Sequence, residues 1–157
     1  MDDVQFGVAG TEDIPELIRL RIAYIAEDLG SVTESEKQSM EAQLPGYFER
    51  KLNKELFAFV ARAEGCLVAA AYLLIVEKPA SPAMPNGRVG EVLSVYTEKA
   101  YRGRGLCSRL MQDLIECAGK HDLCRIDLAA TEEGYPVYKR AGFEETAQKY
   151  TEMRMKL

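Results

Sequence analysis

Apolar residues first alternate with polar ones and then recur every three to four positions at the start of the chain. Val4, Phe6 and Val8 alternate with smaller or polar neighbours, as is typical of a strand. Thr11 then offers an N-cap to a helix whose apolar face runs over residues 14–25. The pattern predicts that the chain opens with a strand followed by a helix.

A second helical pattern covers residues 34–52. Thr33 and Glu36 have the spacing of a capping box, and the apolar positions between 40 and 52 keep a helical phase. Pro45 lies inside this stretch, and proline lacks the amide that a helix interior needs. We therefore expect two short helical pieces here.

The middle of the chain has the composition of β-structure. Residues 56–63 and 66–77 form two apolar runs on either side of the Glu64-Gly65 pair, which predicts a hairpin with a two-residue turn. Prolines and an Asn-Gly pair in residues 79–87 indicate a surface loop, and residues 89–97 return to β-type sequence. A third antiparallel strand is expected there.

The last third alternates between helical and strand patterns. Residues 106–119 predict a helix, 125–130 a strand, and 134–141 a short helix closed by Gly142. Apolar residues alternate with charged ones in 150–157 and predict a final strand. The expected fold is α/β, with a central mixed and mostly antiparallel sheet of six to seven strands and helices on both faces.

Length and charge narrow the class of protein. One domain covering residues 1–157 is expected, and 20 Lys and Arg against 25 Asp and Glu leave a formal charge of −5. This acidic balance argues against nucleic acid as the main partner. No apolar run reaches the ~20 residues of a membrane span, and the start at Met1 lacks the features of a signal peptide. We expect a cytoplasmic protein with no membrane partner.

Cysteine and histidine are too sparse to indicate a metal site. The four cysteines contain no C-x-x-C pair, and His121 is the one histidine of the sequence. The sequence therefore predicts reduced thiols, with neither a zinc site nor a disulfide framework.

The sharpest local signal is a glycine turn at residues 101–108, between a strand and a helix. Glycines let the backbone approach a ligand closely, and the first turn of a helix attracts anions through its free amides and dipole. A Walker loop would need Gly-Lys-Ser/Thr, and a dinucleotide fingerprint would need glycine in place of Ser108. The turn therefore predicts binding of a different phosphate-bearing cofactor.

This turn resembles the hallmark of the GNAT superfamily of acyl-CoA-dependent N-acetyltransferases, Arg/Gln-x-x-Gly-x-Gly/Ala. The match begins at Arg102 and departs only at Cys107, which stands where the family has Gly or Ala. Val95-Tyr96-Thr97 before the turn and Tyr138 with Gly142-Phe143 after it extend the resemblance. The resemblance implies acetyl-CoA as co-substrate, an amine as acceptor, and no metal.

The resemblance also implies where the cofactor binds. The strand before the turn would bulge away from its neighbour and pair with the pantetheine arm, and backbone amides of the turn would hold the pyrophosphate. Thr131 stands where many members have Asn, so its side chain or the backbone would contact the pantetheine arm. The residues carried over as cofactor-binding are Val95, Tyr96, Thr97, Arg102, Gly103, Arg104, Gly105, Leu106, Cys107, Ser108 and Thr131.

For catalysis, the resemblance implies direct attack of the amine on the thioester. Tyr138 matches the tyrosine that protonates the leaving thiolate, and either Glu91 or ordered water would remove the amine proton. A backbone amide near Tyr96 would polarise the carbonyl oxygen. Acceptor recognition would fall to the first two helices, around the acids Glu27, Asp28, Glu34 and Glu36.

Other interpretations stay open at this stage. The chain could be a CoA-binding regulatory module without catalysis, or the acceptor could be a protein N-terminus or lysine instead of a small amine. The final strand at 150–157 could complete its own sheet or pair across the subunits of a homodimer.

Overall fold

The structure is a computed structural model that describes residues 3–157. Met1 and Asp2 lie outside the described residues. They belong to the start of the sequence, which was expected to lack a signal peptide. The strands and helices are β1 (Gln5–Val8), α1 (Ile14–Leu29), α2 (Glu34–Lys51), β2 (Leu56–Ala63), β3 (Cys66–Glu77), β4 (Arg88–Thr97), α3 (Leu106–Lys120), β5 (Arg125–Asp127) and α4 (Tyr135–Ala141). Short 3-10 turns cover Thr11–Asp13 and Lys99–Tyr101.

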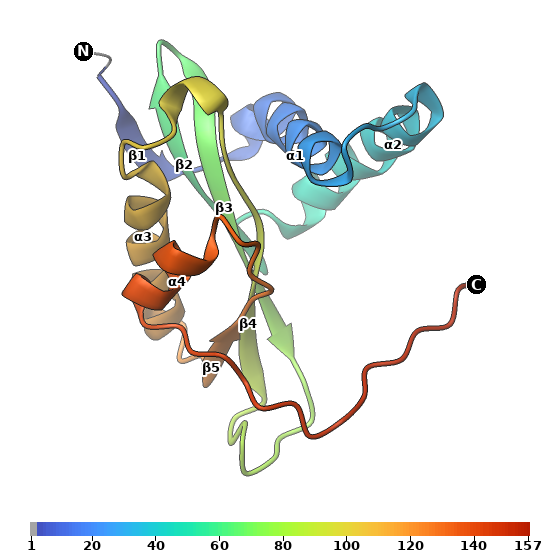
Figure 1. Cartoon of the computed structure of the whole chain (residues 1–157), viewed down its shortest axis with the longest axis vertical. Helices are drawn as coiled ribbons and strands as arrows, with labels where there is room; N and C mark the ends of the chain where they lie inside the picture. Colours follow the sequence, from blue (N-terminus) through green and yellow to red (C-terminus); the bar gives the residue numbers. More distant parts are fainter. Residues whose placement is uncertain (1–2) are drawn as a thin grey trace.

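One sheet with strand order β1-β2-β3-β4-β5 runs through the molecule (Figure 1). β1 to β4 are antiparallel neighbours, and β5 is parallel to β4. The predicted hairpin is confirmed: β2 and β3 join through Glu64 and Gly65, both at positive φ, as a tight turn between twisted strands requires. The mixed, mostly antiparallel sheet is therefore as expected.

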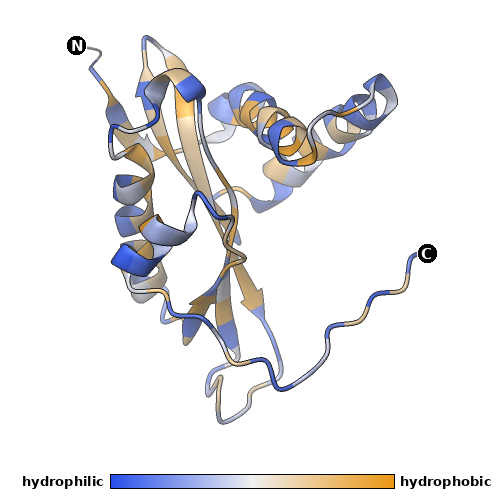
Figure 2. Ribbon diagram, viewed as in Figure 1, coloured by the Kyte–Doolittle hydropathy of each residue, from blue (hydrophilic) through white to orange (hydrophobic). Residues whose placement is uncertain are grey.

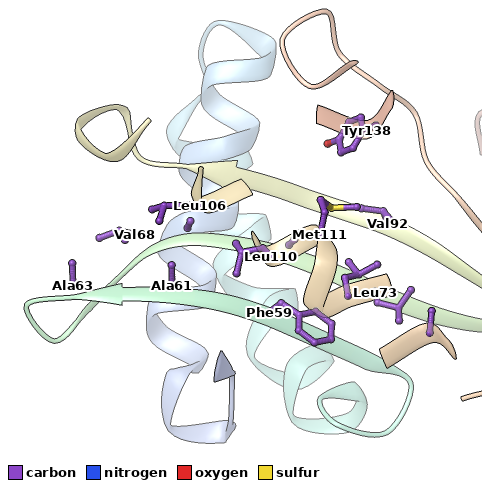
Figure 3. Close-up of a cluster of buried hydrophobic side chains, with 14 residues drawn as sticks. Phe59, Ala61, Ala63, Val68, Leu73, Val92, Leu106, Leu110, Met111 and Tyr138 are labelled. Carbon is purple, nitrogen blue, oxygen red and sulfur yellow. The ribbon is translucent and has the colours of Figure 1, made fainter. Parts of the chain in front are cut away.

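Helices cover both faces of this sheet, as predicted. α1 and α2 lie on one face and α3 and α4 on the other (Figure 1), and apolar residues concentrate where the layers meet (Figure 2). On the α3 side, the largest fully buried side chains are those of Leu73, Leu110, Met111 and Leu114 (Figure 3). On the α1 side they are those of Leu17, Leu20, Phe48, Leu56, Val60 and Leu67.

The first helix begins later than the sequence predicted. Thr11 lies in a 3-10 turn, and the carboxylate of Asp13 accepts the backbone amide of Gly10 at 2.9 Å. The same carboxylate accepts both terminal nitrogens of Arg62, at 2.7 and 2.6 Å. The expected N-cap at Thr11 is wrong because Asp13, held by β2, satisfies the amide at the entry to the helix.

The second helix is continuous, so the expected break at Pro45 is also wrong. The capping box of Thr33 and Glu36 is present as predicted, and α2 runs from there through Pro45. Leu44 and Phe48, on either side of the proline, are both buried in the core. Packing of this apolar stripe offsets the one backbone hydrogen bond that proline removes. Within residues 3–157, no helix is long and apolar enough to cross a membrane.

The sheet has five strands, not the six to seven expected from the sequence. β5 ends at Asp127, and residues 142–157 form no helix or strand. The alternation in 150–157 is present, but this segment leads away from the sheet (Figure 1), and a strand needs a partner for its backbone groups. The prediction of a final strand in this sheet is therefore wrong.

Candidate active site

A large cleft opens where β4 and β5 separate. The two parallel strands pair only at Val89–Arg125, Gly90–Ile126 and Glu91–Asp127. Beyond Glu91, no strand of the described residues pairs with this side of β4. The cleft has a volume of about 1450 Å³ and is lined by residues 91–97 of β4, by Asp127 at the end of β5 and by residues 128–129 after β5. The backbone groups of β4 that face this gap are thus available to a ligand.

A bulge in β4 lies just beyond the point where the two strands separate. The pairing with β3 changes register between Leu93 and Tyr96, and Ser94 has a φ of 51° although it is not glycine. Ser94 is buried close to the Tyr72 phenol, which donates to the Leu17 carbonyl at 3.4 Å, and this packing holds the strained conformation in place. The bulge implied by the family resemblance is therefore present.

The extra residue reverses the faces of β4 on its two sides. Val95 packs against the α3-side cluster and Tyr96 against the α1-side cluster. Glu91 is paired with Leu74, which also packs toward α1. Glu91 and Val95 therefore lie on opposite faces of β4, although regular alternation along a strand would place residues four apart on one face.

The glycine turn places backbone amides that no side chain caps at the other end of the cleft. Gly103 and Gly105 have φ of 74° and 76°, which L side chains rarely adopt, so glycine is needed here for conformation. Gly105 is the N-cap of α3, and no side chain caps the helix. The amides at the start of α3, from Leu106 to Ser108, are therefore not occupied by a capping side chain. With the helix dipole, they form a site suited to a phosphate.

Arg102 is held by the first helix and by β4. Its Nε donates to the carbonyl of Thr97 at 2.8 Å, and a terminal nitrogen donates to the Glu27 carboxylate at 2.9 Å. The guanidinium also lies 5.6 Å from the centre of the Tyr96 ring. This pairing lowers the pKa of Glu27. Arg102 therefore ties α1 to the end of β4 in this structure.

Two other predicted cofactor residues also have local partners. Arg104 is the one predicted cofactor-binding residue that does not line the cleft; its guanidinium lies 4.9 Å from the centre of the Tyr101 ring. Thr131 does line the cleft, and its hydroxyl accepts the amide of Gly134 at 3.1 Å, at the start of α4. Thr131 therefore shapes the turn that leads into the tyrosine helix.

Tyr138 lies at the edge of the α3-side cluster and lines the cleft (Figure 3). Its ring packs edge-on against Phe143, with 6.1 Å between centres. Burial raises the pKa of its phenol to about 12, and the proximity of Cys107 adds to this. A Cβ on Gly134 would meet the Tyr138 ring at 2.7 Å, so a side chain at this position would displace the ring. Tyr138 is thus a buried, neutral phenol at the cleft wall.

Cys107 also lines the cleft and packs against the α3-side cluster. Burial raises the pKa of its thiol, the opposite of what a reactive thiolate needs. Its position supports a packing role at the start of α3.

The wall of the cleft that α1, β4 and β5 form is acidic. Glu91 and Asp127 are opposite each other on β4 and β5, and Glu27 and Asp28 line the cleft from α1. Arg21 and Tyr24 also line the cleft from α1. The sequence did not indicate them as site residues, because their positions resemble those of ordinary residues on the surface of a helix. Glu34 and Glu36 do not line the cleft, since they lie at the N-terminus of α2, where Glu36 is used in capping.

Comparison with known proteins identifies the family. Residues 22–143 match the model of the acetyltransferase (GNAT) family. The chain belongs to this family. Its members transfer an acetyl group from acetyl-CoA, so this chain is a transferase of the acyltransferase class with acetyl-CoA as co-substrate.

Solved structures agree with this assignment. A predicted acetyltransferase from Clostridium acetobutylicum, solved with acetyl-CoA, is 27% identical with a TM-score of 0.84, covering 97% of this chain and 96% of that one. A GCN5-related N-acetyltransferase from Ralstonia eutropha JMP134 is 22% identical (TM-score 0.75; 96% and 99% covered). Glucosamine-6-phosphate N-acetyltransferase from Arabidopsis thaliana is 17% identical (TM-score 0.67; 96% and 98% covered). The last two share the fold alone. No curated protein sequence matches the chain.

The described part of the chain, residues 3–157, contains no group of three or more His, Cys, Asp or Glu side chains placed to hold a metal ion. The polar groups that line the cleft are backbone amides, carboxylates, guanidinium groups, hydroxyls, phenols and the Cys107 thiol.

Proposed function

We propose that this protein acetylates an amine by direct attack on acetyl-CoA in a ternary complex. The observation that supports this most strongly is the shared cleft. It joins the open edge of β4, the uncapped start of α3 and the Tyr138 phenol. These are the three parts that acetyl transfer needs: a strand for the pantetheine arm, an anion site for the pyrophosphate, and a donor for the leaving sulfur.

The cofactor would extend across the cleft from the turn to the gap between β4 and β5. Its pyrophosphate would accept hydrogen bonds from the amides of residues 103–108, and its pantetheine arm would pair with the backbone of residues 95–97. Arg102 and Arg104 would add charge near the phosphates, which for Arg102 requires release from Glu27. Thr131 keeps its O–H free to donate, because its oxygen is the acceptor for Gly134.

In the chemical step, the acceptor would approach from the α1 side of the sheet. Glu91 would take a proton from the ammonium group, and the free amine would attack the carbonyl carbon of the thioester. A backbone N–H near Tyr96 would stabilise the oxyanion, and the C–S bond would break as Tyr138 donates its hydrogen bond to sulfur. The second proton of the attacking nitrogen would pass to the thiolate, so that the products are the amide and the free thiol of CoA. No covalent enzyme intermediate is required.

The charges around the cleft favour an acceptor in its cationic form. The acids Glu27, Asp28, Glu91 and Asp127 outnumber the bases on the same walls. They attract a protonated amine, and Glu91 then lies close to the group that must lose its proton. This supports amines over neutral alcohols as acceptors.

The test begins with calorimetric titration of acetyl-CoA into the wild type and into Gly105→Glu. The new side chain would enter open space, since nothing lies within 4 Å of a Cβ at Gly105. Its negative charge would then oppose the pyrophosphate. We expect binding by the wild type and loss of binding by a folded variant.

A matched control is Gly65→Glu in the β2–β3 turn. Gly65 also has a positive φ, 80°, and open space around a Cβ, but it does not line the cleft. The Gly65→Glu variant should bind acetyl-CoA as the wild type does. A wild type that binds is then offered small amines, peptides with free N-termini and lysine peptides, with thiol release as the readout. Binding without any acceptor would favour a regulatory module; no binding would refute the proposal.

A further inference from the structure

Arg21 is a partly buried arginine in the wall of the cleft. It lies on α1 beside Tyr24, and its guanidinium carbon is 5.8 Å from the centre of the Tyr24 ring. Within residues 3–157, no carboxylate pairs with Arg21 and no oxygen accepts a hydrogen bond from it. A guanidinium has five N–H donors in a planar fork, and contact with a ring face does not use them. The donors of Arg21 are therefore available to a ligand in the cleft.

The other two partly buried arginines among residues 3–157 show what such a side chain ordinarily requires. Arg62 donates to the Asp13 carboxylate at 2.7 and 2.6 Å. The Nε of Arg88 donates to the carbonyl of His121 at 3.3 Å. Burial removes part of the hydration of a guanidinium, and hydrogen bonds to an acceptor offset this loss. Among these three, only Arg21 lacks such an acceptor, and only Arg21 lines the cleft.

Arg21 lies on the same side of the sheet as Glu91. Burial raises the pKa of the phenols of Tyr47 and Tyr72, and the positive charge of Arg21 opposes this rise, so the guanidinium lies near both. Tyr72 and Leu74 both pack toward α1, and Leu74 is the partner of Glu91 on the neighbouring strand. Residues two apart on a strand are separated by ~7 Å. A small molecule can therefore reach both Arg21 and Glu91.

The cleft thus presents two opposite charges on one side of the sheet. Glu91 and Asp127, opposite each other on β4 and β5, attract an ammonium group, whereas Arg21 attracts an anion. The fork of a guanidinium matches the two oxygens of a carboxylate. A single guanidinium among several acids suits one negative charge better than the nearly double charge of a phosphate. These groups fit a molecule that carries both an amine and a carboxylate.

We propose that the acceptor is an amine that also carries a carboxylate, such as an amino acid, and that Arg21 binds this carboxylate. The inference rests on the proposed function, because it names the class of amine that the same site takes. A carboxylate held by Arg21 leaves the amine near Glu91, where the amine must lose its proton. Arg21 acts away from the reacting atoms, so it determines which acceptor binds and takes no part in the chemical step.

The first test compares amino acids with their carboxamides as acceptors, with thiol release as the readout. Linear ω-amino acids of increasing length and α-amino acids are each paired with the amide of the same skeleton, which keeps the amine and lacks the negative charge. We expect kcat/KM for the best acid to exceed that for its amide by roughly 10- to 100-fold. Equal values for every pair, or a preference for an aminoalkyl phosphate of the same length, would overturn the proposal.

Substitution of Arg21 then assigns the preference to this side chain. Arg21→Gln should raise KM for the acids by roughly 10- to 100-fold with little change in kcat, and should change KM for the amides far less. Arg21→Lys keeps the charge without the fork and should recover part of the loss. The matched control is Arg50→Gln, because Arg50 is exposed on α2 and does not line the cleft. An unchanged KM for the acids in Arg21→Gln, or an equal rise for acids and amides, would contradict the assignment.

Equilibrium binding separates this inference from the chemistry. The same acids and amides are titrated into the isotope-labelled protein in the presence of CoA, and binding is followed by NMR. Binding of acids in preference to amides, lost in Arg21→Gln, would support the carboxylate site whether or not an acetyl group is transferred. Absence of binding by every acid would overturn the inference. Acetylation of acids and amides at equal rates would remove the carboxylate site and leave the proposed acetyl transfer in place, so the two proposals fail separately.

Discussion

Replacing Tyr138 by phenylalanine removes one hydroxyl from the cleft and leaves the packing of the ring intact. The ring is 8% exposed and fixed between Phe143 and the turn at Gly134. Its hydroxyl makes no hydrogen bond to another residue of the described chain. The variant should therefore fold and bind acetyl-CoA with unchanged affinity, and a change in rate would report on the hydroxyl alone.

The raised pKa sets the size of the expected effect. The Tyr138 phenol has a pKa of about 12. A thiol has a reference pKa near ~8.5, so complete proton transfer from the phenol to the leaving thiolate is uphill by ~5 kcal/mol. The phenol is thus better suited to donate a strong hydrogen bond to the developing thiolate, worth ~1.5–3 kcal/mol. We expect kcat of Tyr138→Phe to fall by roughly 10- to 150-fold.

The assay measures thiol release at saturating substrates, with calorimetry for acetyl-CoA affinity. Because the raised pKa keeps the phenol protonated from pH 6 to 9, the pH profiles of the wild type and the variant should be parallel. Tyr135→Phe is the matched control, since Tyr135 is half-exposed, one turn earlier on α4 and outside the cleft. A kcat within twofold of the wild type, or an equal loss in Tyr135→Phe, would refute a role for the hydroxyl.

Four further substitutions test other parts of the site and the fold. Glu27→Gln should tighten acetyl-CoA binding by less than about fivefold because it frees Arg102, whereas Arg102→Gln should weaken binding in the same calorimetric assay. Glu91→Gln should lower kcat by roughly 10²–10⁴-fold with little change in KM, and an unchanged kcat would assign proton removal to water. Asp13→Asn should cost ~1–3 kcal/mol in urea unfolding at pH 7. Because Arg62 lowers the folded pKa of Asp13, this contribution is present above the unfolded pKa and lost as the pH falls through the folded one, so the difference should vanish in acid.

Local signals predicted the parts of the site that depend on neighbouring residues. The turn between β4 and α3 could be predicted from its glycines, because the positive φ of Gly103 and Gly105 and the start of α3 are properties of a short segment. The hairpin of β2 and β3 and the capping box of α2 were predicted for the same reason. Where the backbone conformation is encoded within a few residues, the sequence is sufficient.

Long-range contacts account for the features that the sequence did not predict. The pair Glu27–Arg102 joins residues 75 positions apart, and nothing near either residue indicates the other. Pro45 was expected to break a helix, but the buried neighbours Leu44 and Phe48 keep α2 continuous. The face that Val95 occupies does not follow from regular alternation along β4, because the bulge at Ser94 depends on the pairing with β3.

The bulge links these observations to the function. One extra residue in β4 turns Val95 toward α3 and Tyr96 toward α1, and the pairing with β5 stops before this residue, at Glu91. In the proposed mechanism, the open edge of β4 would receive a cofactor that enters from the glycine turn, and the acceptor would reach the strand from the side of α1. A regular β4 paired along its length would leave no such gap. The proposed acetyl transfer would therefore depend on an interruption of the sheet that packing around Ser94 and Tyr72 maintains.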